Sequence, residues 1–139
     1  NTVWNGKRYF LSKCPSGFNV EMDATENYGG DGKGLTPMEL ILAGVAGCIG
    51  IDVTMLLGKN LEKIKKMEIK TEGFRRDEMP TSFTKIETTF TIEGNISQER
   101  LWKAIRLGHK KYCAVSHSLN AEIDYKLNLN GNLVVEKLN

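Results

Sequence analysis

The segment that most constrains this chain is a long apolar helix with a clearly marked start. Thr36 can cap the helix, Pro37 takes the first helical position and Glu39 lies three residues after the cap. This pattern is a capping box with an N1 proline. From Pro37 to about Leu57 nearly every side of the helix is apolar or small, so we expect it to be buried all round. The rest of the chain must then fold around it.

A membrane span is the competing interpretation of this helix. The uninterrupted apolar run extends from Leu40 to Ile51, and Asp52 follows at once. The run is therefore shorter than the roughly 18 residues that a span requires. We expect a central core helix and no membrane association.

The composition is typical of one globular domain in a reducing compartment. The chain has 139 residues, of which 26% are charged, and a net charge of +2. This length suffices for a hydrophobic core, and the small net charge argues against a nucleic-acid partner. Three cysteines without paired spacing fit the cytoplasm better than a secreted disulfide framework. We expect a single domain over residues 1–139, located in the cytoplasm.

Neither a metal nor a cofactor is expected from the motifs. The chain has no Cys-x-x-Cys pair, and its two histidines, His109 and His117, show no spacing typical of zinc. The glycine-rich loop at 26–34 lacks the Ser or Thr that follows the lysine of a phosphate-binding loop, because Lys33 precedes Gly34. We interpret this loop as a mobile cover or a linker.

Alternation and turn residues predict the remaining elements. Asn5 and Gly6 predict an N-terminal hairpin, and Asn130 with Gly131 predicts a C-terminal one. The sequence further predicts strands at 18–22, 64–74, 83–92 and 123–129, a helix starting at Ser97 and a short helical piece at 114–119.

Two cysteines, far apart in the sequence, each lie in a helical context. Cys48 lies in the apolar helix, on the same face as Gly44, and Cys113 follows a second amphipathic stretch. If the fold brings them together, the first thiol can attack and the second can resolve. If it does not, both are small core residues. Cys14 is interpreted as an incidental thiol.

Two motifs carry a resemblance to a known family. From Gly34 to Cys48 the chain reads GLTPMELILAGVAGC, and from Lys111 to Ser116 it reads KYCAVS. With the order of elements around them, these motifs resemble the osmotically inducible protein C and organic hydroperoxide resistance family over essentially the whole chain. The first motif is most similar to a less-studied branch of that family. The resemblance implies an α+β fold with antiparallel sheets around a long buried central helix, in an intertwined homodimer.

The resemblance also implies a chemistry. Cys48 would be the peroxidatic thiolate that attacks a small organic hydroperoxide, and Cys113 would be the resolving thiol. Glu39 is the candidate for the glutamate that family peroxidases carry in the first turn of this helix. An external dithiol would reduce the resulting disulfide.

The chain departs from the peroxidase pattern at the group that activates the thiolate. Family peroxidases use an arginine before the buried helix, held by the glutamate, but this chain has no arginine between Phe10 and Gly73. The family glutamate would align with Met38, one position before Glu39, and Glu39 already has a capping role. Other candidate cations are Arg75, Arg76, Arg106, Lys33 and His117.

Two functions stay open. The first is reduction of small organic hydroperoxides by the cysteine pair, with sites at the interface of a homodimer. The second is a non-catalytic dimer that binds a small hydrophobic ligand or senses redox state through its cysteines. The retained cysteine pair favours the first, and the missing arginine favours the second.

Overall fold

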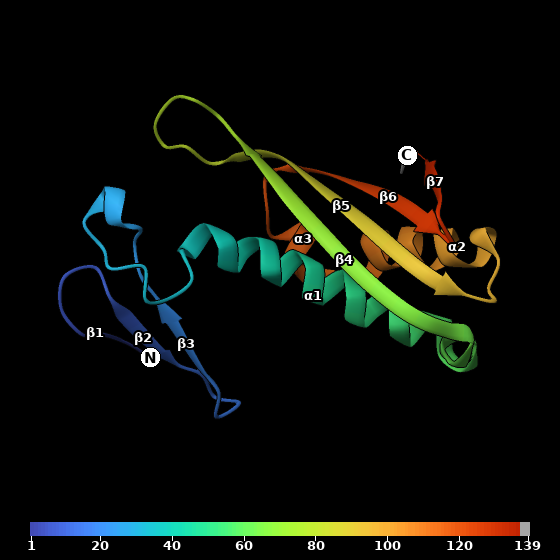
Figure 1. Cartoon of the computed structure of the whole chain (residues 1–139), viewed down its shortest axis with the longest axis horizontal. Coiled ribbons are helices and arrows are strands. Elements are labelled where there is room, and N and C mark those ends of the chain that lie inside the picture. The colour runs from blue at the N-terminus through green and yellow to red at the C-terminus, as the bar shows by residue number, and fades with distance from the viewer. Residues whose placement is uncertain (137–139) are drawn as a thin grey trace. The chain divides into compact units, whose positions relative to one another are not determined.

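The chain divides into an N-terminal unit, Asn1–Ile41, and a C-terminal unit, Leu42–Asn139, each with its own sheet. The computed structural model describes residues 1–136. Figure 1 shows the elements of both units, which are described separately here. The expectation of a single domain stays a prediction.

The sheet of the N-terminal unit forms around the predicted Asn5-Gly6 turn. Gly6 and Lys7 both have positive φ angles, 100° and 45°, which reverse the chain between the first two strands. The three strands pair antiparallel in sequence order. They are β1 (Thr2–Trp4), β2 (Phe10–Lys13) and β3 (Asn19–Met22).

The glycine-rich loop, which includes the short helical turn η1 (Glu26–Tyr28), is anchored by one carboxylate. Asp23 is 3% exposed and accepts backbone N–H bonds from Ala24 at 2.8 Å and from Asp31 and Lys33 at 3.1 Å each. These bonds lower the pKa of the Asp23 carboxyl, and the bond from the Lys33 backbone N–H has the largest effect. The loop interpreted from sequence as a mobile cover or a linker is thus tied to the end of β3.

Helix α1 (Pro37–Leu57) begins as predicted. The backbone N–H and the hydroxyl of Thr36 both donate to Oε2 of Glu39, at 2.8 and 2.9 Å. In return the backbone N–H of Glu39 donates to the Thr36 hydroxyl at 3.3 Å. The capping box is confirmed, and it satisfies backbone donors that the first turn would otherwise leave unpaired.

The expectation that α1 is buried all round is wrong. Val45, Ile49 and Val53 are fully buried, but the opposite side of the helix is open. Ile51 is 63% exposed and Met55 65%. The exposed residues after the first turn, which we call the α1 stripe, are Ala43, Gly47, Ile51 and Met55. The reason is geometric: the sheet and helices of one C-terminal unit cover only part of the helix circumference.

By length and composition, the helical stretch Pro37–Lys63, which includes η2 (Gly58–Lys63), is sufficient to cross a membrane. The core helices of soluble proteins pass the same test. The absence of membrane association stays a prediction.

The sheet of the C-terminal unit has the order β4-β5-β6-β7 and is mixed, so the expectation of antiparallel sheets is wrong at one pair. β5 and β6 run parallel, while the outer pairs are antiparallel. The chain between β5 and β6 passes through helices and crosses over, which brings the next strand back in the same direction. The strands are β4 (Ile64–Arg75), β5 (Phe83–Gly94), β6 (Glu122–Leu129) and β7 (Asn132–Val135).

The helices of the crossover lie with α1 on one face of this sheet (Figure 1). They are α2 (Gln98–Leu107), the π-helical turn η3 (Gly108–Tyr112) and α3 (Ala114–His117). Ser97 caps α2, as predicted, by accepting the backbone N–H of Arg100. Alternate residues of β5, among them Ile86 and Phe90, are fully buried and pack with Trp102 of α2. Helix α1 approaches the sheet closely at Gly50, where a Cβ would lie 2.8 Å from Cδ1 of Ile69.

Candidate functional site

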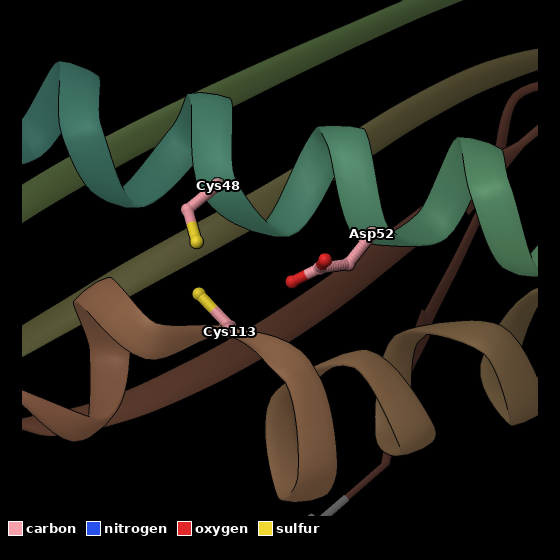
Figure 2. Close-up of side chains that lie close together, drawn as sticks. All are labelled: Cys48, Asp52 and Cys113. Atoms are coloured by element: carbon pink, nitrogen blue, oxygen red, sulfur yellow. The ribbon is translucent and has the colours of Figure 1, made fainter.

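Cys48 and Cys113, 65 positions apart in the sequence, meet in the C-terminal unit. The two sulfurs and a carboxylate oxygen of Asp52 all lie within 4.8 Å of one another. Figure 2 shows the two thiols pointing at each other, with the Asp52 carboxylate directed towards the space beside them. We call these three side chains the thiol–carboxylate cluster. Both cysteines are free thiols, Cys48 half-buried and Cys113 buried.

The π-helical turn η3 brings Cys113 to the cluster. The backbone N–H of Cys113 bonds to the Gly108 carbonyl at 2.8 Å, a wider turn than that of an α-helix. Gly108 lies close to α1, since a Cβ on it would be 3.0 Å from Cδ1 of Ile49 and 3.6 Å from Cβ of Asp52. The glycine therefore lets the second helical segment approach α1 beside Asp52.

The surroundings of Cys48 disfavour its thiolate. Burial raises the pKa of the Cys48 thiol, and the Cys113 side chain and the negative charge of Asp52 raise it further. The backbone N–H of Val115 acts in the opposite direction, because a hydrogen bond to sulfur favours the thiolate. The net effect is a raised pKa, which favours the thiol form of Cys48 over its thiolate.

Asp52 is the third member of the cluster. Its Oδ2 atom is buried and, among residues 1–136, accepts no hydrogen bond. A buried carboxylate oxygen without a donor is costly, so such groups are rare in folded proteins. From the sequence, Asp52 lies four residues after Cys48 and therefore on the same helix face, where an acidic group disfavours the thiolate if the two side chains lie close. The structure places them close together.

Tyr125 lies near the two cysteines and contacts His109, whose ring stacks on that of His117. The Tyr125 hydroxyl is 3.3 Å from Nδ1 of His109. Burial is the main cause that raises the pKa of Tyr125, and the two nearby cysteines raise it further. Burial also lowers the pKa of His109, which favours its neutral form. Nε2 of His117 lies 2.8 Å from the backbone oxygen of His109, so this ring nitrogen contacts that carbonyl.

The other cations considered from sequence have partners of their own. Arg75 donates to Thr81 at 2.6 Å, Arg76 donates to backbone carbonyls of 78 and 79, and Arg106 pairs with Glu136. Lys33 pairs with Asp31 at 3.3 Å in the N-terminal unit. In the described part of the chain, none of these bonds joins a cation to Cys48.

Glu39 and Cys14 both belong to the N-terminal unit. The Glu39 carboxylate accepts the two capping bonds from Thr36. Both bonds lower the pKa of this carboxyl, and the backbone bond has the larger effect. Its catalytic role stays a prediction. Cys14 is a free, half-buried thiol.

Comparison with known proteins places the cluster in a family context. Residues 30–128 match the model of the family described as OsmC-like protein. Protein YhfA of Escherichia coli K12 is 33% identical over 116 residues, which cover 83% of this chain and 84% of YhfA. An organic hydroperoxide resistance protein-like protein of Staphylococcus aureus is 26% identical over 113 residues, 80% of each chain. The structure of a hypothetical protein from Aquifex aeolicus superposes with a TM-score of 0.75 at 29% identity, over 94% of this chain and 95% of that one.

Proposed function

This chain belongs to the OsmC-like protein family, and on that premise we propose that it reduces small organic hydroperoxides with its own thiols. The observation that carries the proposal is the meeting of Cys48 and Cys113 within 4.8 Å, with the first thiol half-buried and the second buried. The family includes proteins named for organic hydroperoxide resistance, which supports this substrate class.

The proposed reaction has two steps. The Cys48 thiolate attacks one oxygen of the O–O bond, which breaks to give a Cys48 sulfenic acid and, after protonation, an alcohol. The Cys113 thiolate then attacks the sulfenic sulfur, so that a disulfide forms and water leaves. An external dithiol returns both cysteines to thiols by disulfide exchange. Such a cycle fits the cytoplasm, where thiols are kept reduced.

We further propose that the chain forms a homodimer through the α1 stripe. Ala43, Gly47, Ile51 and Met55 make a continuous row at four-residue spacing, and an exposed row of apolar and small residues on a core helix suits helix-to-helix contact. A dimer would also cover this side of α1. Ile51→Glu should convert the dimer to a monomer by placing a charge in the contact, as measured by light scattering after gel filtration. Lys59→Glu, at an exposed position beyond the helix end, serves as the control, and a dimer unaffected by Ile51→Glu would refute the α1 interface.

The function is tested by counting thiols after one equivalent of an organic hydroperoxide, with a chelator present throughout. The wild type and Cys14→Ser should each lose two thiols per chain, and Cys48→Ser should lose none. Cys113→Ser should stop at a sulfenic acid that a dimedone probe traps. A wild-type chain that keeps all its thiols over minutes would exclude the reaction.

The second candidate is a non-catalytic dimer that binds a small hydrophobic ligand. One observation favours it: burial and Asp52 raise the pKa of Cys48, and no cation contact offsets them in the described residues. Under this alternative the peroxide would leave the thiol count unchanged, so that the same experiment separates the two functions.

A further inference from the structure

We propose that the thiol–carboxylate cluster is a binding site for a thiophilic divalent cation, with Zn²⁺ as the natural candidate. Cys48, Cys113 and Asp52 would supply three ligand atoms, and the fourth position would be open to water or a substrate. No spacing motif in the sequence indicates this site, because two of its ligands come from one helix and the third from a turn far along the chain.

The spacing of the three ligand atoms is compatible with a tetrahedral zinc site. Two sulfurs bound to one Zn²⁺ at about 2.3 Å and at the tetrahedral angle lie roughly 3.8 Å apart. The three ligand atoms of the cluster already lie within 4.8 Å of one another, so a bound ion requires shifts of about 1 Å or less. Such shifts are within reach of side-chain rotation at Cys48 and Asp52, which are both half-buried.

The orphaned carboxylate is the second observation that points to a ligand. Oδ2 of Asp52 is buried without a hydrogen-bond donor in residues 1–136, and Figure 2 shows this carboxylate directed towards the sulfurs. A buried acceptor normally has a partner. A divalent cation between the sulfurs and the carboxylate would provide one and would neutralise negative charge that the three ligands bring together.

The donor set selects the class of ion. Mg²⁺ and Ca²⁺ prefer oxygen ligands alone, whereas two thiolates with one carboxylate suit Zn²⁺. Sites with three protein ligands keep an open position, and Cys48 is half-buried, which gives an ion access to the cluster. Metal binding would release the thiol protons and would occupy both sulfurs.

The test uses Co²⁺ as a spectroscopic probe on the full reduced chain, followed by displacement with Zn²⁺. The wild type should show a sulfur-to-cobalt charge-transfer band at one equivalent, together with the strong visible bands of a tetrahedral ion, and Zn²⁺ should abolish them. Asp52→Asn, which keeps the shape of the side chain, should weaken affinity by at least about tenfold. Cys48→Ser should lose the two-sulfur spectrum.

Two matched controls define the outcome. Cys14→Ser removes another half-buried thiol and Glu87→Gln another half-buried carboxylate, and both should bind Co²⁺ as the wild type does. A wild type without the charge-transfer band, or a Cys48→Ser variant with an unchanged spectrum, would overturn the site. Circular dichroism establishes that each variant is folded.

Metal binding does not depend on peroxide chemistry, so the two proposals can fail separately. The thiol count with a chelator present reports on the peroxide reaction alone, and the Co²⁺ spectrum without peroxide reports on the metal alone. If both hold, Zn²⁺ should slow the loss of thiols to peroxide, because the ion occupies the attacking sulfur. This last readout rests on the proposed function.

Discussion

Two carboxylates of the C-terminal unit have opposite surroundings. Glu87, on the outer face of the sheet, accepts hydrogen bonds from Lys85 at 2.7 Å and from Lys126 at 2.8 Å. These bonds lower the pKa of Glu87 to about 2, and the bond from Lys126 has the largest effect. Asp52, on α1, has a buried oxygen without a donor in the described chain and lies beside two thiols.

Glu87 therefore has a clear structural role, whereas the folding of the chain alone does not explain the position of Asp52. Glu87 links two strands, because Lys85 lies on β5 and Lys126 on β6, and each charge in this group has a partner. Asp52 contributes no such link in the described residues, and its negative charge raises the pKa of the adjacent Cys48 thiol. A costly group of this kind is commonly retained for a ligand or a reaction.

The largest effect is expected on the reactivity of Cys48. Asp52→Asn removes a negative charge from the cluster while keeping its shape, so the pKa of Cys48 should fall, while burial, the main cause of its elevation, stays in place. The alkylation rate of Cys48 at neutral pH and without metal should rise about threefold. Iodoacetamide labelling followed by mass spectrometry of the Cys48 peptide measures this rate. Glu87→Gln should leave it unchanged, and a rate that is equal in all three proteins would remove Asp52 from the environment of the thiol.

A smaller effect is expected on stability, with opposite signs at the two carboxylates. Asp52→Ala removes an unsatisfied buried oxygen and places a better helix former in α1, so the metal-free protein should gain about 1 kcal/mol in free energy of unfolding. Glu87→Ala should destabilise the protein, because it leaves Lys85 and Lys126 without their shared partner. Urea denaturation of both variants measures the two changes. Loss of stability in Asp52→Ala would show that the carboxylate has a structural partner.

The stability of the protein should also depend on pH through Glu87. The pKa of Glu87 is about 2 in the folded chain, below its ordinary value of 4.5, so its contribution to stability is complete above pH 4.5. That contribution should be lost as the pH falls from 4.5 towards 2, because the unfolded chain takes up the proton first. The difference in urea midpoint between wild type and Glu87→Gln should therefore shrink over this interval. A difference that is constant with pH would mean that the two lysines do not stabilise the carboxylate.

Local signals predicted much of the fold correctly. The capping box at Thr36 and Glu39, the cap at Ser97 and the turns at Asn5 and Asn130 all appear where the sequence places them, and β6 and β7 meet at the last of these turns. Each depends on residues within a few positions of one another. Backbone sterics and short-range hydrogen bonds determine such features without reference to the rest of the chain.

Features that depend on distant segments were predicted less well. Periodicity alone does not set strand direction, so the parallel pairing of β5 with β6 was missed. It also does not show how much of a helix one chain can cover, and the α1 stripe was therefore expected to be buried. The π-helical turn that positions Cys113 had no sequence signal beyond a glycine at its start.

The sequence by itself determined that α1 is a capped apolar helix, that it carries Cys48 and that Asp52 shares a face with this thiol. It also contained the motifs by which the family is identified. Only the tertiary structure decided that Cys113 closes the cluster and that the group beside the two thiols is the Asp52 carboxylate and not a cation. The physical reason is that helix spacing is a local property of the backbone. The distance between two helices is instead determined by how their side chains pack, here around Gly108 and Ile49.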